Sequence, residues 1–235
     1  MATIVATQSV GELAIETPGA ARVFEKLGID FCCGGKKSLE AACLEKGIGL
    51  KTVLRALADQ GQNPKAAAPD LHWRAEPVQS LMTYIVERHH HYVRTETPRI
   101  EQWMEKCIAA HGARHPELQQ VRHTFAAMAS EMAQHMAKEE LILFPAIARA
   151  STGGASASLA APVKMMMIEH DHSGRDLAEI RKASGDYTPP PDVCATYRSL
   201  YRALAEFEAD LRQHVHLENN ILFPRALAFG ISSKP

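Results

Sequence analysis

The chain has 235 residues, 46% of them hydrophobic, and a formal net charge of −1 at pH 7. This composition supports a packed core, the near-zero charge argues against nucleic acid as a partner, and no apolar run approaches the roughly 18 residues of a membrane helix. Because the N-terminus does not resemble a signal peptide and the five cysteines do not suit a disulfide framework, we expect a cytoplasmic protein without a membrane partner.

The first predicted unit is a small helical domain over residues 1–62, which carries Asp-Phe-Cys-Cys-Gly-Gly-Lys-Lys-Ser at 30–38. Ser38 is typical of a helix N-cap. Cys32 and Cys33 lie close to that helix start and to two lysines, so we expect raised reactivity. An adjacent pair suits redox exchange or transient metal contact better than a structural disulfide. The alternative is that both are small buried hydrophobic residues.

Residues 63–76 are predicted to form a linker, which begins in a segment rich in proline and alanine. Four long helical patterns follow, over about 77–110, 116–149, 162–182 and 192–227, separated by segments rich in glycine, serine or proline. Strand patterns are nearly absent. We therefore predict an all-α fold, in which the small N-terminal helical domain is followed by an antiparallel four-helix bundle over residues 77–229.

The second and fourth helical patterns share a sequence motif. His-Met-Ala-Lys-Glu at 135–139 and His-Val-His-Leu-Glu at 214–218 each set a histidine and a glutamate four residues apart, with Ile-Leu-Phe-Pro beginning three residues after the glutamate. Such residues share one helix face. The apolar stripe around the first copy, which includes Phe125, Met132 and Ile142, directs both polar side chains inward. Buried charges are rare unless they are paired or bind a metal, so the two copies predict a metal site.

The remaining histidines differ in helical phase. His170 shares the inner face of the third helix, and both His89 and His90 border the apolar side of the first, so that phase does not choose between them. His172 and His216 point away from the inner face, and we expect them to be solvated or to support the ligands. Surface positions are expected for the other histidines near segment ends or outer faces: His72, His111, His115 and His123.

The inner face would then hold four imidazoles and two carboxylates, without a thiolate. These donors suit two first-row metal ions about 3.5–4 Å apart, bridged by the glutamates. The zinc-protease signature His-Glu-x-x-His is absent, and a buried dinuclear site favours iron or manganese. We expect two iron ions, bridged by carboxylate and by an oxo or hydroxo group.

Together these motifs strongly resemble the repair-of-iron-centres (RIC) family of di-iron iron-sulphur cluster repair proteins. The resemblance rests on Asp-Phe-Cys-Cys-Gly-Gly, an Arg-x-His at 88–90, the two repeated phrases and Glu-His-Asp at 169–171, and it covers essentially the whole chain. It implies a hemerythrin-like di-iron bundle, and it selects the histidine of Arg-x-His as the ligand from the first helix. The iron ligands that it implies are His90, His135, Glu139, His170, His214 and Glu218.

The resemblance implies a protein of the nitrosative and oxidative stress response that repairs damaged iron-sulphur clusters by donating iron and binds nitric oxide. It implies a role for Cys32 and Cys33 in redox or iron transfer. Glu131 and Glu169, near the ligands, would guide protons or departing iron, or serve as ordinary hydrogen-bond partners. Expected partners are nitric oxide, damaged iron-sulphur proteins and a reductant, with the chain a monomer or a homodimer.

Two alternatives stay open. Two adjacent iron ions would also suit a nitric oxide scavenger or reductase that forms nitrous oxide. A dioxygen carrier or sensor is less favoured, because hemerythrins use more histidines and lack the Cys-Cys domain.

Overall fold

The computed structural model describes residues 5–61, 70–153 and 158–229. Within these ranges the prediction of an all-α fold is confirmed, and the strand-like structure is confined to an isolated bridge between Ser9 and Ser38. Contacts divide the chain into two units, residues 1–81 with 213–235 and residues 82–212. Of the predicted linker, residues 63–69 lie outside the described part, and η1 (Asp70–Arg74) is a short 3₁₀ helix.

Short helices build the N-terminal part of the first unit. The Ser38 side chain caps the third of them by accepting the backbone N–H of Ala41, as predicted, and Gly28 and Gly47 end the second and third in the left-handed conformation. Phe31, in the loop that follows the second helix, is fully buried in the core. The helices are α1 (Val10–Glu16), α2 (Ala20–Leu27), α3 (Leu39–Lys46) and α4 (Leu50–Gly61).

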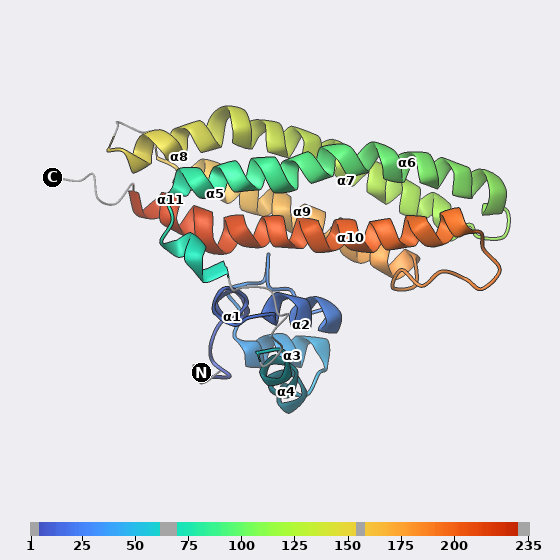
Figure 1. Cartoon of the computed structure of the whole chain (residues 1–235), viewed down its shortest axis with the longest axis horizontal. Coiled ribbons are helices and arrows are strands. Elements are labelled where there is room, and N and C mark those ends of the chain that lie inside the picture. The colour runs from blue at the N-terminus through green and yellow to red at the C-terminus, as the bar shows by residue number, and fades with distance from the viewer. Residues whose placement is uncertain (1–4, 62–69, 154–157, 230–235) are drawn as a thin grey trace. The chain divides into compact units, whose positions relative to one another are not determined.

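Four long helical segments lie side by side in the bundle (Figure 1). Three of them contain a π-helical turn, η2, η3 or η4, and run through it without a break. Their ends fall within a few residues of the predicted ones. The segments are α5 (Val78–Tyr84), η2 (Ile85–His90) and α6 (His91–His111); α7 (Glu117–Lys138), η3 (Glu139–Leu143) and α8 (Phe144–Ser151); α9 (Ala160–Ala183); and α10 (Ala195–Leu217), η4 (Glu218–Leu222) and α11 (Phe223–Phe229).

The interior of the second unit is apolar and aromatic. Phe125 of α7 and Phe207 of α10 meet edge to face, with ring centroids 5.3 Å apart, and Tyr92 of α6 packs on the same Phe207 at 6.2 Å. Helices α6, α7 and α10 therefore meet through one aromatic cluster. None of the helices in the described ranges combines the length and the apolar character needed to cross a membrane.

A buried charge ties α9 to α10. Glu208, 1% exposed, accepts hydrogen bonds from Arg181 at 3.0 Å, from Arg212 at 2.7 Å and from the Tyr187 hydroxyl at 2.6 Å. Burial, and then the adjacent carboxylate, raises the pKa of Tyr187. The carboxylate is thus fully surrounded by donors, which is what a buried charge requires.

One predicted apolar position is wrong. Ile142 is 64% exposed, whereas Leu143 and Phe144 are buried. In the π turn η3, the Phe144 N–H donates to the carbonyl of Glu139, five residues earlier, so one extra residue shifts the phase of the stripe. Pro145 follows directly and has no N–H to restore the regular pattern.

Candidate metal centre

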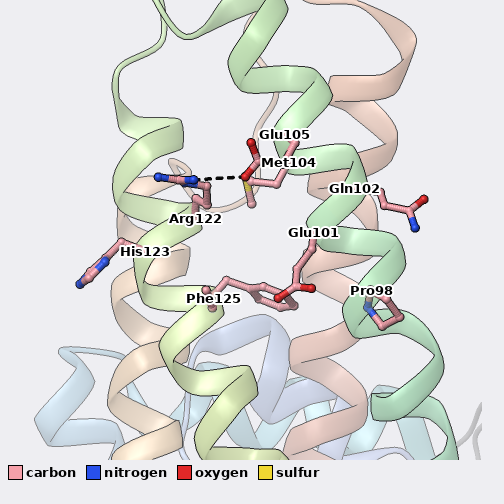
Figure 2. A pocket seen from close by; sticks show the side chains of 9 residues that line it. Pro98, Glu101, Gln102, Met104, Glu105, Arg122, His123 and Phe125 are labelled. Carbon is pink, nitrogen blue, oxygen red and sulfur yellow. Dashed lines mark hydrogen bonds and ion pairs between the residues drawn. The ribbon is translucent and has the colours of Figure 1, made fainter.

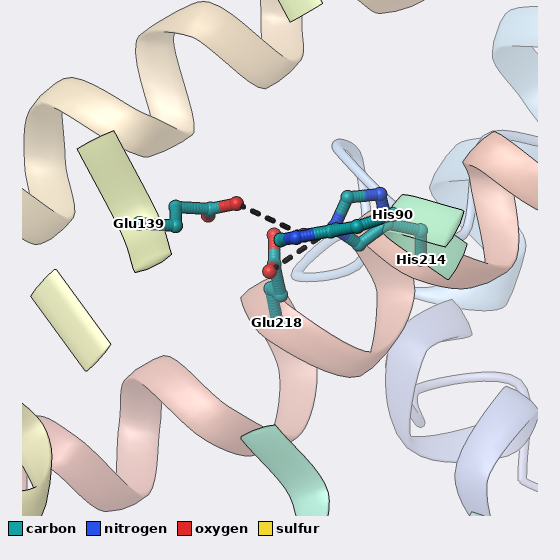
Figure 3. A group of neighbouring side chains, drawn as sticks. All are labelled: His90, Glu139, His214 and Glu218. Carbon is teal, nitrogen blue, oxygen red and sulfur yellow. Dashed lines mark hydrogen bonds and ion pairs between the residues drawn. The ribbon is translucent and has the colours of Figure 1, made fainter. Parts of the chain in front are cut away.

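The six predicted ligands gather into two groups of four side chains, and both glutamates belong to both groups. Within each group every residue offers one ligand atom, and these atoms lie within 4.8 Å of one another. All six side chains are at most 2% exposed. Figure 3 shows the first group, with its side chains pointing toward one another. The groups are His90, Glu139, His214 and Glu218, and His135, Glu139, His170 and Glu218.

The imidazoles present their Nε2 atoms to the centre of these groups. His90 Nε2 lies 3.4 Å from one carboxylate oxygen of Glu139, and His135 Nε2 lies 3.2 Å from the other. The Nε2 atoms of His135 and His170 are 3.0 Å apart. Donor atoms from three segments therefore converge on the same carboxylate.

The π turns position three of the six residues. His90 ends η2, whereas Glu139 and Glu218 begin η3 and η4. In η4 the Phe223 N–H donates to the Glu218 carbonyl, and Pro224 follows. Sequence reasoning missed these turns, although π turns are frequent at functional sites. The available signal is the proline, which lacks an N–H and follows each glutamate by six residues.

A carboxylate that sequence reasoning did not single out supports His90 from behind. His90 Nδ1 donates to Glu140 at 2.6 Å, and Arg94 contacts the same oxygen at 2.6 Å. Burial raises the pKa of Glu140, but the hydrogen bonds from these two residues outweigh it, so the pKa lies below its ordinary value. A carboxylate behind the imidazole is typical of metal-bound histidines.

Glu169 has the same relation to His135. His135 Nδ1 donates to Glu169 at 2.8 Å, and Lys138 also pairs with this carboxylate. Burial raises the pKa of Glu169, but the bonds from Lys138 and His135 bring it below its ordinary value. Glu131 is exposed, and its charge, after burial, raises the pKa of Asp176.

The structure separates the two histidines that helical phase left open. His89 Nδ1 donates to Asp210 at 3.0 Å, whereas His90 lies in the first group of ligands. The surface position expected for His111 is wrong, because this side chain is buried with its ring edge-on to Tyr197, the centroids 5.6 Å apart.

The loop that carries the two cysteines is bound to η4 within the first unit. Asn219 donates to the carbonyl of Cys32 at 3.2 Å, and Asn220 donates to the carbonyl of Phe31 at 3.0 Å and to His216 Nδ1 at 2.9 Å. His216 is fully buried rather than solvated, because the Phe31 ring packs on it at 5.3 Å. Burial lowers the pKa of His216 to about 4, so it is neutral at pH 7.

A separate pocket of about 550 Å³ is lined by side chains of α6 and α7 (Figure 2). Glu105 and Arg122 form an ion pair at 3.2 Å beside it. None of the predicted site residues lines this pocket. The pocket is therefore separate from the predicted metal site.

The donor set fits a metal ion. Four imidazoles and two carboxylates without a thiolate suit divalent first-row ions. Two fully buried carboxylates in an apolar bundle would otherwise carry a large desolvation cost, which a bound cation offsets.

Comparisons with known proteins agree with this interpretation. Residues 6–60 match ScdA_N, described as a domain of unknown function, and residues 81–226 match the hemerythrin HHE cation binding domain. The second match includes all six residues of the two groups.

Relatives match almost the whole chain. It is 38% identical over 220 residues to the iron-sulfur cluster repair protein YtfE of Pectobacterium carotovorum subsp. carotovorum (strain PC1), covering 94% of this chain and 96% of the relative. It is 37% identical over 222 residues to a probable iron-sulfur cluster repair protein of Haemophilus influenzae, covering 94% and 97%. The YtfE protein of Yersinia pseudotuberculosis is 36% identical over 220 residues, covering 94% and 96%.

Proposed function

The chain belongs to the iron-sulfur cluster repair (RIC) family, and from this premise we propose that it holds two iron ions and repairs damaged clusters by donating iron. The observation that carries the proposal is the pair of buried groups that share both glutamates. Nitrogen and oxygen donors hold Fe(II) less firmly than thiolates do, so such a centre suits an iron that must leave.

The two groups suggest how the ligands divide. Each ion would take two imidazoles, and both glutamates would bridge, with the inward Nε2 atoms as the ligating nitrogens. When bound, the iron pair supplies redox chemistry and positions where nitric oxide can bind. The proposed ligands are His90 and His214 for one ion, His135 and His170 for the other, and Glu139 and Glu218 for both.

Neighbouring side chains would hold the ligands in place and meet the solvent. Glu140 and Glu169 accept the Nδ1–H groups of His90 and His135, which keeps Nε2 directed inward. Because Glu169 is also partly exposed, it suits a role in guiding protons or departing iron. For Glu131 the same role is proposed on its sequence position alone.

We further propose that Cys32 and Cys33 take part in redox or iron transfer. Nitric oxide, damaged iron-sulfur proteins and a reductant would be the partners, and the cytoplasm the location. Whether the chain acts as a monomer or a homodimer would follow from its mass in solution.

Iron transfer tests this proposal directly. Mössbauer spectra would be recorded on the anaerobically purified full chain before and after exposure to nitric oxide and to an apo-ferredoxin acceptor. We expect two coupled irons that move into the acceptor's cluster. His135→Ala should lose iron, whereas His123→Ala, an exposed histidine on the same helix, is the matched control and should keep it.

Two outcomes would contradict the proposal. Full iron occupancy in His135→Ala would refute the ligand assignment. Iron that stays in place while nitrous oxide accumulates would instead favour a nitric oxide reductase.

A further inference from the structure

A second cluster of donor atoms lies in the loop between α2 and α3. Asp30, Cys32 and Cys33 each offer one ligand atom, and these atoms lie within 4.8 Å of one another. The two sulfur atoms are 3.8 Å apart, and Asp30 Oδ1 is 3.3 Å from Cys32 Sγ. The cluster shares no residue with the His/Glu groups.

These separations match those of a tetrahedral metal site. A disulfide would bring the sulfurs to about 2.05 Å. An ion with thiolate bonds of about 2.3 Å holds two sulfurs about 3.8 Å apart at the tetrahedral angle, and a carboxylate oxygen at about 2.0 Å would lie about 3.5 Å from each sulfur. The 3.8 Å between the two sulfurs and the 3.3 Å between Asp30 Oδ1 and Cys32 Sγ are close to these values, and the ligand atoms of Asp30 and Cys33 lie within 4.8 Å of each other.

Hydrogen bonds hold the loop that carries these donor atoms. Asp30 Oδ1 accepts the backbone N–H groups of Cys32 at 3.2 Å and Cys33 at 3.0 Å. Two side-chain amides also bind the loop backbone: Asn219 donates to the carbonyl of Cys32, and Asn220 donates to the carbonyl of Phe31. The Cys32 thiol also donates to Oδ1, but this bond ends when the thiol loses its proton to a metal ion. A carboxylate has about four acceptor positions, so the two backbone bonds leave room for an ion. Fixed donors lose little freedom when they bind.

The cluster is enclosed on one side and open on the other. Cys32 is 3% exposed, whereas Cys33 is only half-buried. An ion can therefore enter from solvent, and water can complete its coordination.

We propose that Asp30, Cys32 and Cys33 form a second cation site, for a first-row divalent ion that favours thiolate ligands, such as Zn²⁺ or Fe²⁺. Binding replaces the two thiol protons, which pass to the solvent, and nothing is oxidised. The site deepens the proposed role of Cys32 and Cys33 in iron transfer, but it does not depend on the His/Glu groups, since it would hold an ion whether or not those groups bind iron.

Cobalt titration of the full chain tests the site. The reduced, metal-free protein would be titrated anaerobically with Co²⁺ while the thiolate-to-cobalt charge-transfer absorption is followed. We expect this absorption to saturate at one equivalent of thiolate-bound cobalt, and to be lost in Cys33→Ser. Asp30→Asn keeps an oxygen for the two backbone N–H groups but removes the charge. It should weaken binding by at least the roughly 10-fold that the loss of a hydrogen-bond partner of a metal ligand costs.

Matched controls separate this site from the others. Cys194→Ser removes an exposed thiol outside the cluster and should leave the absorption unchanged. His135→Ala alters the His/Glu groups and should also leave the charge-transfer absorption unchanged. A wrong assignment of the Asp30, Cys32 and Cys33 site can therefore be told apart from a wrong assignment of the His/Glu groups. Absence of the charge-transfer absorption, its full retention in Cys33→Ser, or its loss in Cys194→Ser would overturn the proposal.

Discussion

Sharing of the two glutamates predicts an unequal response to ligand removal. Glu218 belongs to both groups of side chains, whereas His214 belongs to one. Removing the imidazole should therefore weaken the binding of one ion, and removing the carboxylate should weaken the binding of both ions. We predict that His214→Ala retains about one iron per chain, and that Glu218→Ala retains almost none.

The magnitude follows from linkage. If the loss of one ligand among four weakens the binding of an ion about 100-fold, the contribution of that ion to the free energy of unfolding at saturating metal falls by about 2.7 kcal/mol. For a chain of this size, 1 kcal/mol corresponds to roughly 2–4 °C in melting temperature. We expect iron-loaded His214→Ala to melt about 5–11 °C lower, and Glu218→Ala about twice as far below the unsubstituted protein.

The assay is iron content together with melting curves of iron-loaded and iron-free protein. The iron-free curves remove the effect of the cavity that each truncation leaves, which is substantial because both side chains are fully buried. Equal iron loss and equal iron-linked shifts in the two variants would refute the shared-glutamate reasoning.

Three further predictions concern stability and thiol reactivity. Tyr187→Phe removes the hydroxyl that donates to buried Glu208 at 2.6 Å, so urea unfolding should show a loss of about 1.5–3 kcal/mol; an unchanged midpoint would contradict this. Backbone N–H groups at the start of α10 lower the pKa of exposed Cys194, whereas burial raises the pKa of Cys107 to about 11. Since the thiolate fraction at a given pH rises as the pKa falls, iodoacetamide at neutral pH should modify Cys194 faster than Cys107, and mass spectrometry showing equal rates for these two thiols would be inconsistent with these environments. Gly35→Ala would place a methyl group 2.8 Å from the carbonyl oxygen of Phe31 and against the side-chain amide of Asn220. It should lower the free energy of unfolding by about 1–3 kcal/mol in thermal unfolding; an unchanged melting temperature would argue against this close approach.

Periodicity was enough to predict the four long helices and five of the six buried ligand side chains, whereas His90 was selected over His89 by the family resemblance. A histidine and a glutamate four residues apart share a face in any α-helix, so their inward direction follows from the apolar residues around them. The same periodicity gave a wrong prediction for Ile142, because a fixed period of 3.6 residues does not extend through a π turn.

Long-range packing could not be predicted from local patterns. His216 is buried because Phe31, distant in the sequence, packs on it. The role of Glu140 depends on the position of His90 on another helix. Such contacts require the tertiary fold, which periodicity does not supply.

The glutamate-to-proline interval also fixes an angular relation. Each residue turns an α-helix by about 100°, and each π turn accommodates one residue beyond the regular number. In η4 the Phe223 N–H meets the Glu218 carbonyl five residues earlier, whereas a regular helix makes this bond after four. Deleting one residue between Glu218 and Pro224 would therefore restore a regular helix and leave the carboxylate in about the same direction relative to α11. The extra residue therefore changes which side chains of the turn face the solvent, as exposed Leu141 and Ile142 show in the other copy, while the glutamate and the helix after the proline keep their common phase.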